Sequence, residues 1–314
     1  MDNLNNMFNN ISTTSKKARV SFLNKVDLNN LDNVDKILLD HINTSNNIGT
    51  KYNRIKHIFK YIEESNPSNP LYNKYKQMGD ELSNQIHIKR DTNNLENDQK
   101  SERYIELSDL KIKLLSLYPK FSLKELKKNN NMNEFIHTIN KLQDYLLISL
   151  YVNNAPLRND YADINIVSSK KAATDTKKNY MILNNRSVYI KLNVYKNSER
   201  INKQYTIEIS KYNIRLIRLL KALYKYIDYP FEFLFNHISR NKIEKSTNTS
   251  LVKRIPILSV SYFGKPLSIN DYRHIYEMEL QHSERYKNMN IIEREQEHQL
   301  LLHSTSEAMR YNRV

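Results

Sequence analysis

The sequence predicts a mainly α-helical fold with one small antiparallel β-sheet, an α+β class, divided between two domains. Apolar residues recur at helical spacing along most of the 314-residue chain, while three short segments rich in β-branched and aromatic residues lie together between residues 181 and 210. Residues 84–103 lose the apolar spacing and are rich in charged and turn-forming residues, as in an interdomain linker. Because a chain of this length exceeds the usual size of one hydrophobic core, we expect a domain boundary near residue 95.

The N-terminal domain is expected over residues 19–95 and to be entirely helical, after a flexible basic tail at residues 1–18. Apolar residues predict one amphipathic helix between Leu28 and Ile42 and a second between Tyr52 and Ile62. Basic residues lie between the apolar positions of the second helix: Lys51, Arg54, Lys56 and Lys60. A basic outer face on a helix suits the phosphates of a DNA backbone, so these four residues are candidate DNA contacts.

The second domain is expected over residues 96–314. It begins with two predicted helices, Ile105–Leu117 and Phe135–Val152, of which the latter is apolar enough to be largely buried. The strand-like segments follow and predict the small antiparallel sheet. They are residues 181–185, 188–196 and 204–210. The next helix starts at Ile214 and is terminated by Pro230, since proline breaks a helix, and the remaining chain is again mostly helical in pattern.

The charge of the chain favours a polyanionic partner. A formal net charge of +15 and an isoelectric point near 9.5 are typical of proteins that bind nucleic acid, such as double-stranded DNA. A membrane surface is a competing polyanion, and lysine-rich faces are also commonly just solvated or a product of AT-rich codons. No apolar run approaches the roughly 20 residues that span a bilayer, and the N-terminus lacks the order of a secretion signal. We therefore expect an intracellular, non-secreted protein located with DNA and not with a membrane.

Two residue counts narrow the possible chemistry. The chain has no cysteine, which excludes disulfides, thiolate zinc sites and cysteine nucleophiles. Its three glycines, Gly49, Gly79 and Gly264, are too far apart to build a glycine-rich loop for ATP or a dinucleotide. We expect no cofactor and no metal, and a nucleophile that is an oxygen or a lysine.

Residue types suited to metal-free cleavage of a phosphodiester occur in one order along the C-terminal two-thirds of the chain. Such a reaction needs an attacking hydroxyl, cationic donors around the phosphate oxygens and an acid that protonates the departing sugar oxygen. The candidates are Arg158, Lys196, Arg273, His303 and Tyr311.

Each candidate also has a simpler explanation when it is taken alone. Arg158 could neutralise Asp160 or Asp163, and Lys196 could be one of many solvated lysines. Arg273 and His274 could pair with Glu277 on a helix surface for a few tenths of a kcal/mol. His303 could cap the apolar residues 300–302, and Tyr311 is one of 22 tyrosines, in what could be a frayed end.

Four segments carry the candidates, in the order LLISLYVNNAPLRNDYADINI, LNVYKNSERINKQYTIEIS, SYFGKPLSINDYRHIYE and LLLHSTSEAMRYN. They follow two helical segments, NIGTKYNRIKHIFKYIEE and PLYNKYKQMGDEL. Together these segments resemble the tyrosine recombinases, phage-integrase-like enzymes, and most closely the divergent branch of giant DNA viruses, virophages and related mobile elements. The resemblance spans nearly the whole chain and implies an all-α core-binding domain followed by a catalytic domain that cuts and rejoins DNA.

The resemblance also implies a role for each residue. Tyr311 would attack the scissile phosphate to form a 3′-phosphotyrosyl bond, Arg158, Arg273 and His303 would stabilise the transition state, and Lys196 would protonate the leaving 5′-oxygen. The enzyme would be a site-specific recombinase or integrase that needs neither metal nor ATP. It would assemble as a tetramer on DNA, in the host nucleus or a viral factory if the chain is viral.

Four departures from the family pattern bear on this expectation. Asn270 occupies the place of a histidine three residues before the second arginine, and it can donate a hydrogen bond to a phosphate oxygen but cannot become cationic. Leu302 replaces the usual glycine before His303, and the spacing from His303 to Tyr311 is one residue shorter than the commonest form. Because three residues follow Tyr311, we expect no exchanged C-terminal helix, so that subunit contacts differ or are weak.

Three other functions remain open from the sequence. A type IB topoisomerase shares the fold and chemistry but relaxes supercoils as a monomer. A catalytically silent relative would bind DNA without cutting it, which Asn270 and Leu302 favour. A basic structural or virion protein with chance motifs would leave the candidate residues scattered in space.

Overall fold

The computed structural model describes residues 4, 7–8, 13–25, 40, 42–92, 104–120, 132–184, 187–195, 198, 204–209, 213–224, 231–239 and 242–302. The chain divides into two compact units, Met1–Asn94 and Leu95–Val314, and each has a hydrophobic core of its own. The described residues are mainly helical with small sheets, which confirms the α+β class. Within these residues, no helix combines the length and apolar character that crossing a membrane requires.

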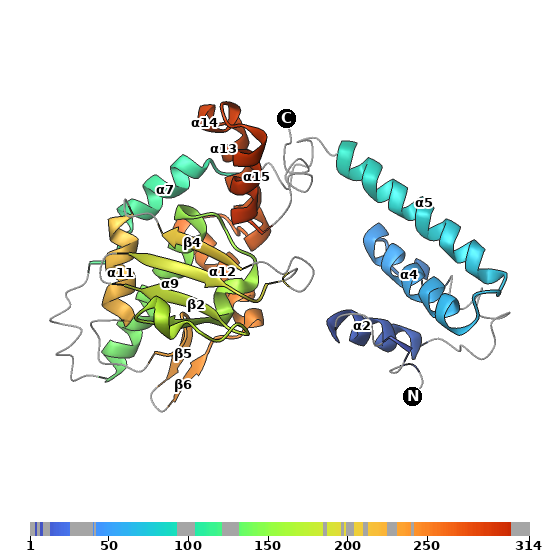
Figure 1. The fold of residues 1–314 in the computed structure, drawn as a ribbon, viewed down its shortest axis with the longest axis horizontal. Coiled ribbons are helices and arrows are strands. Elements are labelled where there is room, and N and C mark those ends of the chain that lie inside the picture. Colours follow the sequence, from blue (N-terminus) through green and yellow to red (C-terminus); the bar gives the residue numbers. More distant parts are fainter. Residues whose placement is uncertain are drawn as a thin grey trace. The chain divides into compact units, whose positions relative to one another are not determined.

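The first unit is built on a hairpin of two helices, α4 (Ile48–Ser65) and α5 (Leu71–Thr92), with the shorter α2 (Thr13–Leu23) packed against α4 (Figure 1). The buried residues of its core include Ile55, Ile58 and Ile62 on α4 and Tyr75 on α5. Gly79 marks the close approach of the two helices, because a Cβ atom there would lie 3.2 Å from Cε1 of Phe59.

Two expectations for this unit differ from the structure. Residues 13–18 are not part of a flexible tail but form the start of α2, and Arg19 of this helix lies 4.6 Å above the ring of the buried Phe8. The linker expected from residue 84 does not begin there, because α5 continues to Thr92. Residues 84–92 contain neither proline nor glycine, so nothing breaks the helix, and the lost apolar pattern matches exposure of this end, where Ile88 is 62% exposed. The helix expected between Leu28 and Ile42 falls mostly outside the described residues.

The four candidate DNA contacts all lie on α4 but not on one face of it. At about 100° per residue, Lys56 and Lys60 lie close together on one side, and Lys51 and Arg54 lie on another. Lys60 forms an ion pair with Glu63, and the Arg54 guanidinium donates a hydrogen bond to Oγ1 of Thr44 at 2.9 Å. The helix therefore presents two pairs of basic residues in place of the single basic face expected.

A half-buried histidine makes the stability of this unit depend on pH. The ring of His57 lies 5.9 Å from that of Phe22, and burial, with smaller effects of Arg19 and Lys56, lowers its pKa to about 4. Since the unfolded chain has a histidine pKa of about 6.5, the unfolded state binds more protons between these two values, and stability is lost as the pH falls through this range. His57→Gln should therefore weaken the pH dependence of amide-exchange protection in α4 between pH 7 and 5. The exposed His87→Gln is the control, and an unchanged dependence in His57→Gln would contradict the assignment.

The second unit contains a four-stranded sheet, β1 (Ile164–Val167), β2 (Asn179–Leu183), β3 (Val188–Leu192) and β4 (Tyr205–Ile209), in that spatial order. The pairs β2–β3 and β3–β4 are antiparallel as expected, but β1 pairs with β2 in parallel, so the expectation of a wholly antiparallel sheet was wrong. A separate hairpin, β5 (Asn236–Ser239) and β6 (Lys242–Lys245), was not expected. Its strands, NHIS and KIEK, are too short and polar to give a period-two pattern.

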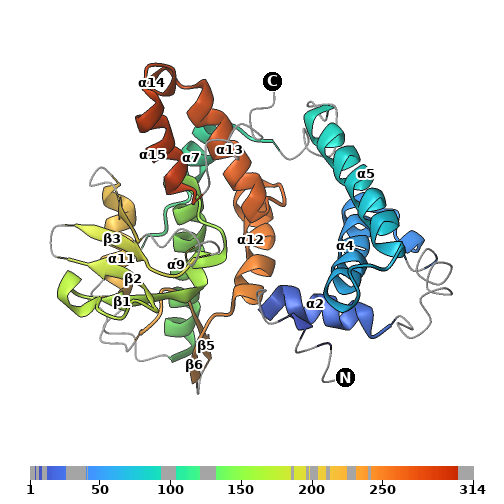
Figure 2. The same cartoon turned by 45° about the vertical axis from the view of Figure 1, so that its right-hand side comes forward.

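Helix α9 (Met132–Asn153) is the centre of this unit and is largely buried, as predicted. It contacts α7 (Leu107–Ser116), α11 (Ile214–Tyr224) and α12 (Asn248–Phe263), and Figure 2 shows it between the sheet and α12. The chain then forms three further helices. They are α13 (Ile269–His282), α14 (Glu284–Lys287) and α15 (Ile291–Leu300).

Candidate active site

A capping box fixes the start of α13 and thereby the place of two candidate residues. The side chain of Ser268 accepts a hydrogen bond from the backbone N–H of Asp271, and the Asp271 carboxylate accepts one from the backbone N–H of Ser268 at 2.7 Å. Asn270 therefore lies in the first turn, with an exposed side chain, and Arg273 lies one turn further on. The exposure of Asn270 leaves its amide accessible to a ligand.

Arg273 is buried and ties two distant segments together. Its side chain is 2% exposed, Nη1 donates a hydrogen bond to the carbonyl oxygen of Pro156 at 2.6 Å, and Nη2 donates one to that of Leu301 at 2.8 Å. The alternative that places Arg273 on the surface of the helix is therefore wrong. A buried guanidinium needs such acceptors, because an uncompensated charge in the protein interior is costly.

Arg158 lies near the carbonyl oxygen of Leu302, the residue after Leu301, at the C-terminal end of α15. It follows the buried Leu157 and is half-buried itself, and its Nη1 lies 3.3 Å from the carbonyl oxygen of Leu302. Its own carbonyl oxygen accepts a hydrogen bond of 2.9 Å from the hydroxyl of the buried Tyr151. The structure thus brings Arg158 and Arg273 to consecutive carbonyls at the C-terminal end of α15, where the helix dipole favours cations.

The backbone turns sharply at this helix end. Leu302 has a φ of 57°, the left-handed conformation that glycine adopts most readily after a helix, and its side chain is 4% exposed. This is the position at which the sequence departs from the glycine of the family pattern. The leucine keeps the left-handed turn that a glycine there would favour, and His303 follows it directly in the sequence.

A buried polar network holds α15 against α13. Nδ1 of His298 lies 2.8 Å from a carboxylate oxygen of Glu277, which also accepts a hydrogen bond of 2.8 Å from the amide of Gln281. The other ring nitrogen of His298 lies 2.6 Å from the hydroxyl of Tyr286, on α14. Glu277 and His298 are fully buried, so the network fixes the end of α15 relative to Arg273.

The two aspartates near Arg158 have different partners. Asp163 forms an ion pair with Lys245 and accepts a hydrogen bond of 3.2 Å from the amide of Asn248, so Arg158 is not needed to neutralise it. Burial raises the pKa of Asp160, and the charges of Arg158 and Arg273 oppose this increase. The alternative that Arg158 partly neutralises Asp160 therefore remains open beside the prediction that Arg158 binds a phosphate.

A cavity of about 420 Å³ adjoins the Arg158 segment. Asn159 and Asp160, which follow Arg158, line it together with Asn179 and Val194. Lysines that the sequence analysis had not selected also line it: Lys177, Lys178 and Lys245. The adjacent lysines Lys177 and Lys178, directly before a strand, were the sequence feature that could have indicated this cavity. Adjacent lysines are too common in this chain for that pair to stand out.

Lys196, His303 and Tyr311 lie outside the residues that the structure describes. The described neighbours of Lys196 are ordered by hydrogen bonds: the backbone N–H of Tyr195 donates to Oγ of Ser198 at 3.2 Å, and this hydroxyl donates to the carbonyl oxygen of Tyr195 at 2.9 Å. These contacts bracket Lys196 in the sequence. The assignment of these three residues to the site remains a prediction.

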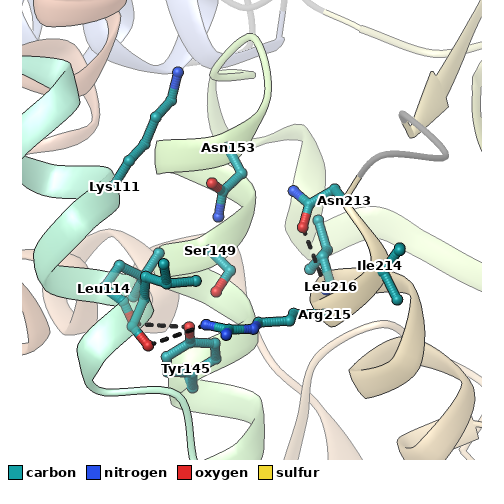
Figure 3. A pocket seen from close by; sticks show the side chains of 10 residues that line it. Lys111, Leu114, Tyr145, Ser149, Asn153, Asn213, Ile214, Arg215 and Leu216 are labelled. Atoms are coloured by element: carbon teal, nitrogen blue, oxygen red, sulfur yellow. Dashed lines mark hydrogen bonds between the residues drawn. The ribbon is translucent and has the colours of Figure 1, made fainter.

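A second cavity, of about 370 Å³, lies among α7, α9 and α11 and contains none of the candidate residues (Figure 3). The hydroxyl of Tyr145 donates a hydrogen bond of 2.8 Å to the carbonyl oxygen of Leu114 there, and Arg215 donates one of 3.4 Å to that of Leu115. Tyr145 and Arg215 are thus both engaged with the C-terminal end of α7.

No protein-family model matches the chain, and no curated protein matches it. Among solved structures, the chain is similar to XerA recombinase, with a TM-score of 0.38 and 12% sequence identity over 97% of this chain and 88% of that chain. A likeness at this TM-score does not establish a common fold.

Proposed function

We propose that this protein is a site-specific DNA recombinase of the tyrosine type, an integrase that cuts and rejoins strands through a 3′-phosphotyrosyl intermediate. One observation carries the proposal: Arg158 and Arg273, far apart in the sequence, donate to the consecutive carbonyls of Leu302 and Leu301. The predicted His303 and Tyr311 follow this helix end in the sequence. Two guanidinium groups, a histidine and a tyrosine would supply the cationic donors and the attacking hydroxyl that phosphodiester cleavage without a metal requires.

In the proposed reaction, the phenol of Tyr311 loses its proton to water, its oxygen forms a bond to the scissile phosphorus, and the bond from phosphorus to the 5′-oxygen breaks. Lys196 gives its proton to that oxygen, while Arg158, Arg273 and His303 stabilise the additional negative charge on the phosphate. The amide of Asn270 adds one neutral hydrogen bond. A 5′-hydroxyl of another strand then reverses the step, so the phosphodiester energy is conserved and no nucleotide is consumed.

The helical first unit would hold the DNA. Its basic pairs on α4, Lys51 with Arg54 and Lys56 with Lys60, would contact phosphates, and the net charge of +15 supports a strongly salt-dependent affinity. Recombination joins two duplexes, so the active assembly would be a tetramer on DNA.

The proposal is tested by trapping the covalent intermediate. Wild-type protein is incubated with a randomised pool of duplexes that carry one nick, so that a short 5′-hydroxyl fragment diffuses away after cleavage and religation stops. We expect a protein–DNA adduct that survives denaturant. Proteolysis of this adduct should leave a DNA-linked peptide that contains Tyr311. Binding without any adduct would identify a silent DNA-binding relative, and an adduct on a different residue would overturn the proposed site.

The distinction from a type IB topoisomerase needs a second measurement. Two differently labelled duplexes that contain the trapped sequence are mixed with the protein. A recombinase yields joint products that carry both labels, whereas a topoisomerase yields none. In a separate assay, a topoisomerase relaxes a supercoiled plasmid.

A further inference from the structure

Asn179, the first residue of β2, makes an unusual set of contacts with the end of the neighbouring strand. Its side chain is 3% exposed, and its carboxamide oxygen accepts hydrogen bonds from the backbone N–H groups of Asn193 and Val194 at 2.8 and 2.9 Å. Its amide nitrogen donates to the carbonyl oxygen of Val194 at 2.7 Å. One side chain thus satisfies three backbone groups of two consecutive residues.

These contacts lie where the β-ladder ends. The antiparallel pairing of β2 with β3 runs from Leu183 opposite Val188 to Tyr180 opposite Lys191, and β3 ends at Leu192. Beyond that point the carboxamide of Asn179 provides the hydrogen bonds that a backbone partner provides within the sheet. The direction in which the chain leaves β3 is therefore set by a side chain.

The same two segments are also joined in the opposite sense. The amide of Asn193 donates hydrogen bonds to the carbonyl oxygens of Lys178 at 2.6 Å and Asp175 at 3.3 Å, so an asparagine from each segment binds the backbone of the other segment. Tyr195 is fixed next, through its two hydrogen bonds with the hydroxyl of Ser198. The chain is tied at each residue from Asn193 to Tyr195, immediately before Lys196.

We propose that Asn179 is a positioning residue for the general acid Lys196. Asn179 and Val194 line the cavity of about 420 Å³ together with Asn159 and Asp160, which adjoin Arg158, so the clasped segment and the arginine segment border one space. By fixing the two residues before Tyr195, Asn179 sets the course of the chain that leads to Lys196. This inference rests on the proposed function and adds a residue that touches no substrate.

A substrate with sulfur in place of the bridging 5′-oxygen separates positioning of the acid from other defects. A thiolate is a much weaker base than an alkoxide and leaves without a proton, so cleavage of such a duplex does not need Lys196. The ordinary duplex is the one identified by trapping. Asn179→Ala should cleave it about 10²-fold more slowly than the wild type, which is the loss of rate expected when a catalytic group is misplaced. It should cleave the sulfur-containing duplex at close to the wild-type rate. Lys196→Ala should show the same selective rescue.

Three further variants complete the experiment. Asn288→Ala is the control, because Asn288 is an exposed asparagine of the same unit, at the end of α14, and does not line the cavity, so both duplexes should be cleaved normally. Asn179→Asp keeps the acceptor for two N–H groups and loses the donor. We expect a smaller loss of cleavage rate, which the sulfur-containing duplex should rescue equally well. Asn179→Ser replaces Asn179→Ala in the experiment if Asn179→Ala does not fold. Equal slowing of both duplexes in the Asn179 variants, with Lys196→Ala rescued, would overturn the inference. Failure to rescue Lys196→Ala would instead overturn the assignment of the acid in the proposed function.

Discussion

Tyr311→Phe is expected to bind the trapped duplex with the affinity of the wild type and to form no covalent adduct. The substitution removes one oxygen, the atom that would form the bond to phosphorus, and leaves the ring in place. No other group in the proposed site can replace that oxygen, so the expected loss is complete and exceeds the 10²- to 10³-fold effect typical of removing a single transition-state donor. Denaturing electrophoresis with labelled DNA measures the adduct, and a gel-shift titration measures binding.

The matched control is Tyr104→Phe, the same change at a partly exposed tyrosine of the same unit, which should behave as the wild type in both measurements. An adduct formed by Tyr311→Phe would show that a different residue is the nucleophile. Loss of DNA binding in this variant would show that the phenol serves affinity and not chemistry.

Arg273→Lys is expected to reduce DNA cleavage by about 10²- to 10³-fold, because a planar guanidinium is replaced by a single ammonium group. Arg273 holds the carbonyl oxygens of Pro156 and Leu301 with two nitrogen atoms, and a lysine cannot reach both in this geometry. The buried position also disfavours the charged form of a lysine. We therefore expect a lower free energy of unfolding as well, by about 1.5–3 kcal/mol for each charged hydrogen bond that is lost.

The two effects of Arg273→Lys can be separated. Cleavage is measured in single turnover at a temperature where thermal melts show the variant to be folded, with Arg285→Lys as the control. Arg285 carries the same charge on α14, with an exposed side chain paired to Glu297, and its replacement should change neither quantity. A folded Arg273→Lys protein that cleaves at the wild-type rate would leave Arg273 with a purely structural role.

The elements that the sequence predicted well are those with a one-sided or wholly apolar pattern. Helix α9 and strands β2 to β4 lie where their apolar residues placed them, because α9 and β2 are apolar enough to be buried and β3 and β4 alternate in burial along the strand. The parallel strand β1 was missed because it has only four residues, too few for a clear strand pattern. Its partner β2 lies beyond η2 (Lys170–Ala172) in the sequence, so no short turn indicates the pairing. The end of α5 was missed because its residues are mostly polar, and polar residues without an apolar stripe give no periodic signal.

For the candidate site, the sequence supplied an order of residue types but no distances. The meeting of Arg158 and Arg273 depends on where α15 ends, and that in turn depends on the buried pair Glu277 and His298, which no local pattern reveals. The clasp formed by Asn179 is equally hidden, since its partners are backbone atoms of another strand. Asparagine is moreover so abundant in this chain that a single functional one does not stand out.

The left-handed turn at Leu302 has a consequence for how such chains are found. A leucine in this conformation carries a backbone strain of about 1–2 kcal/mol, and burial of its side chain offsets that strain. A search pattern that requires the letter glycine before the histidine rejects this chain, although its backbone bends as a glycine would allow. A pattern written in dihedral angles would retain it, together with other chains that pack a large side chain over the same bend.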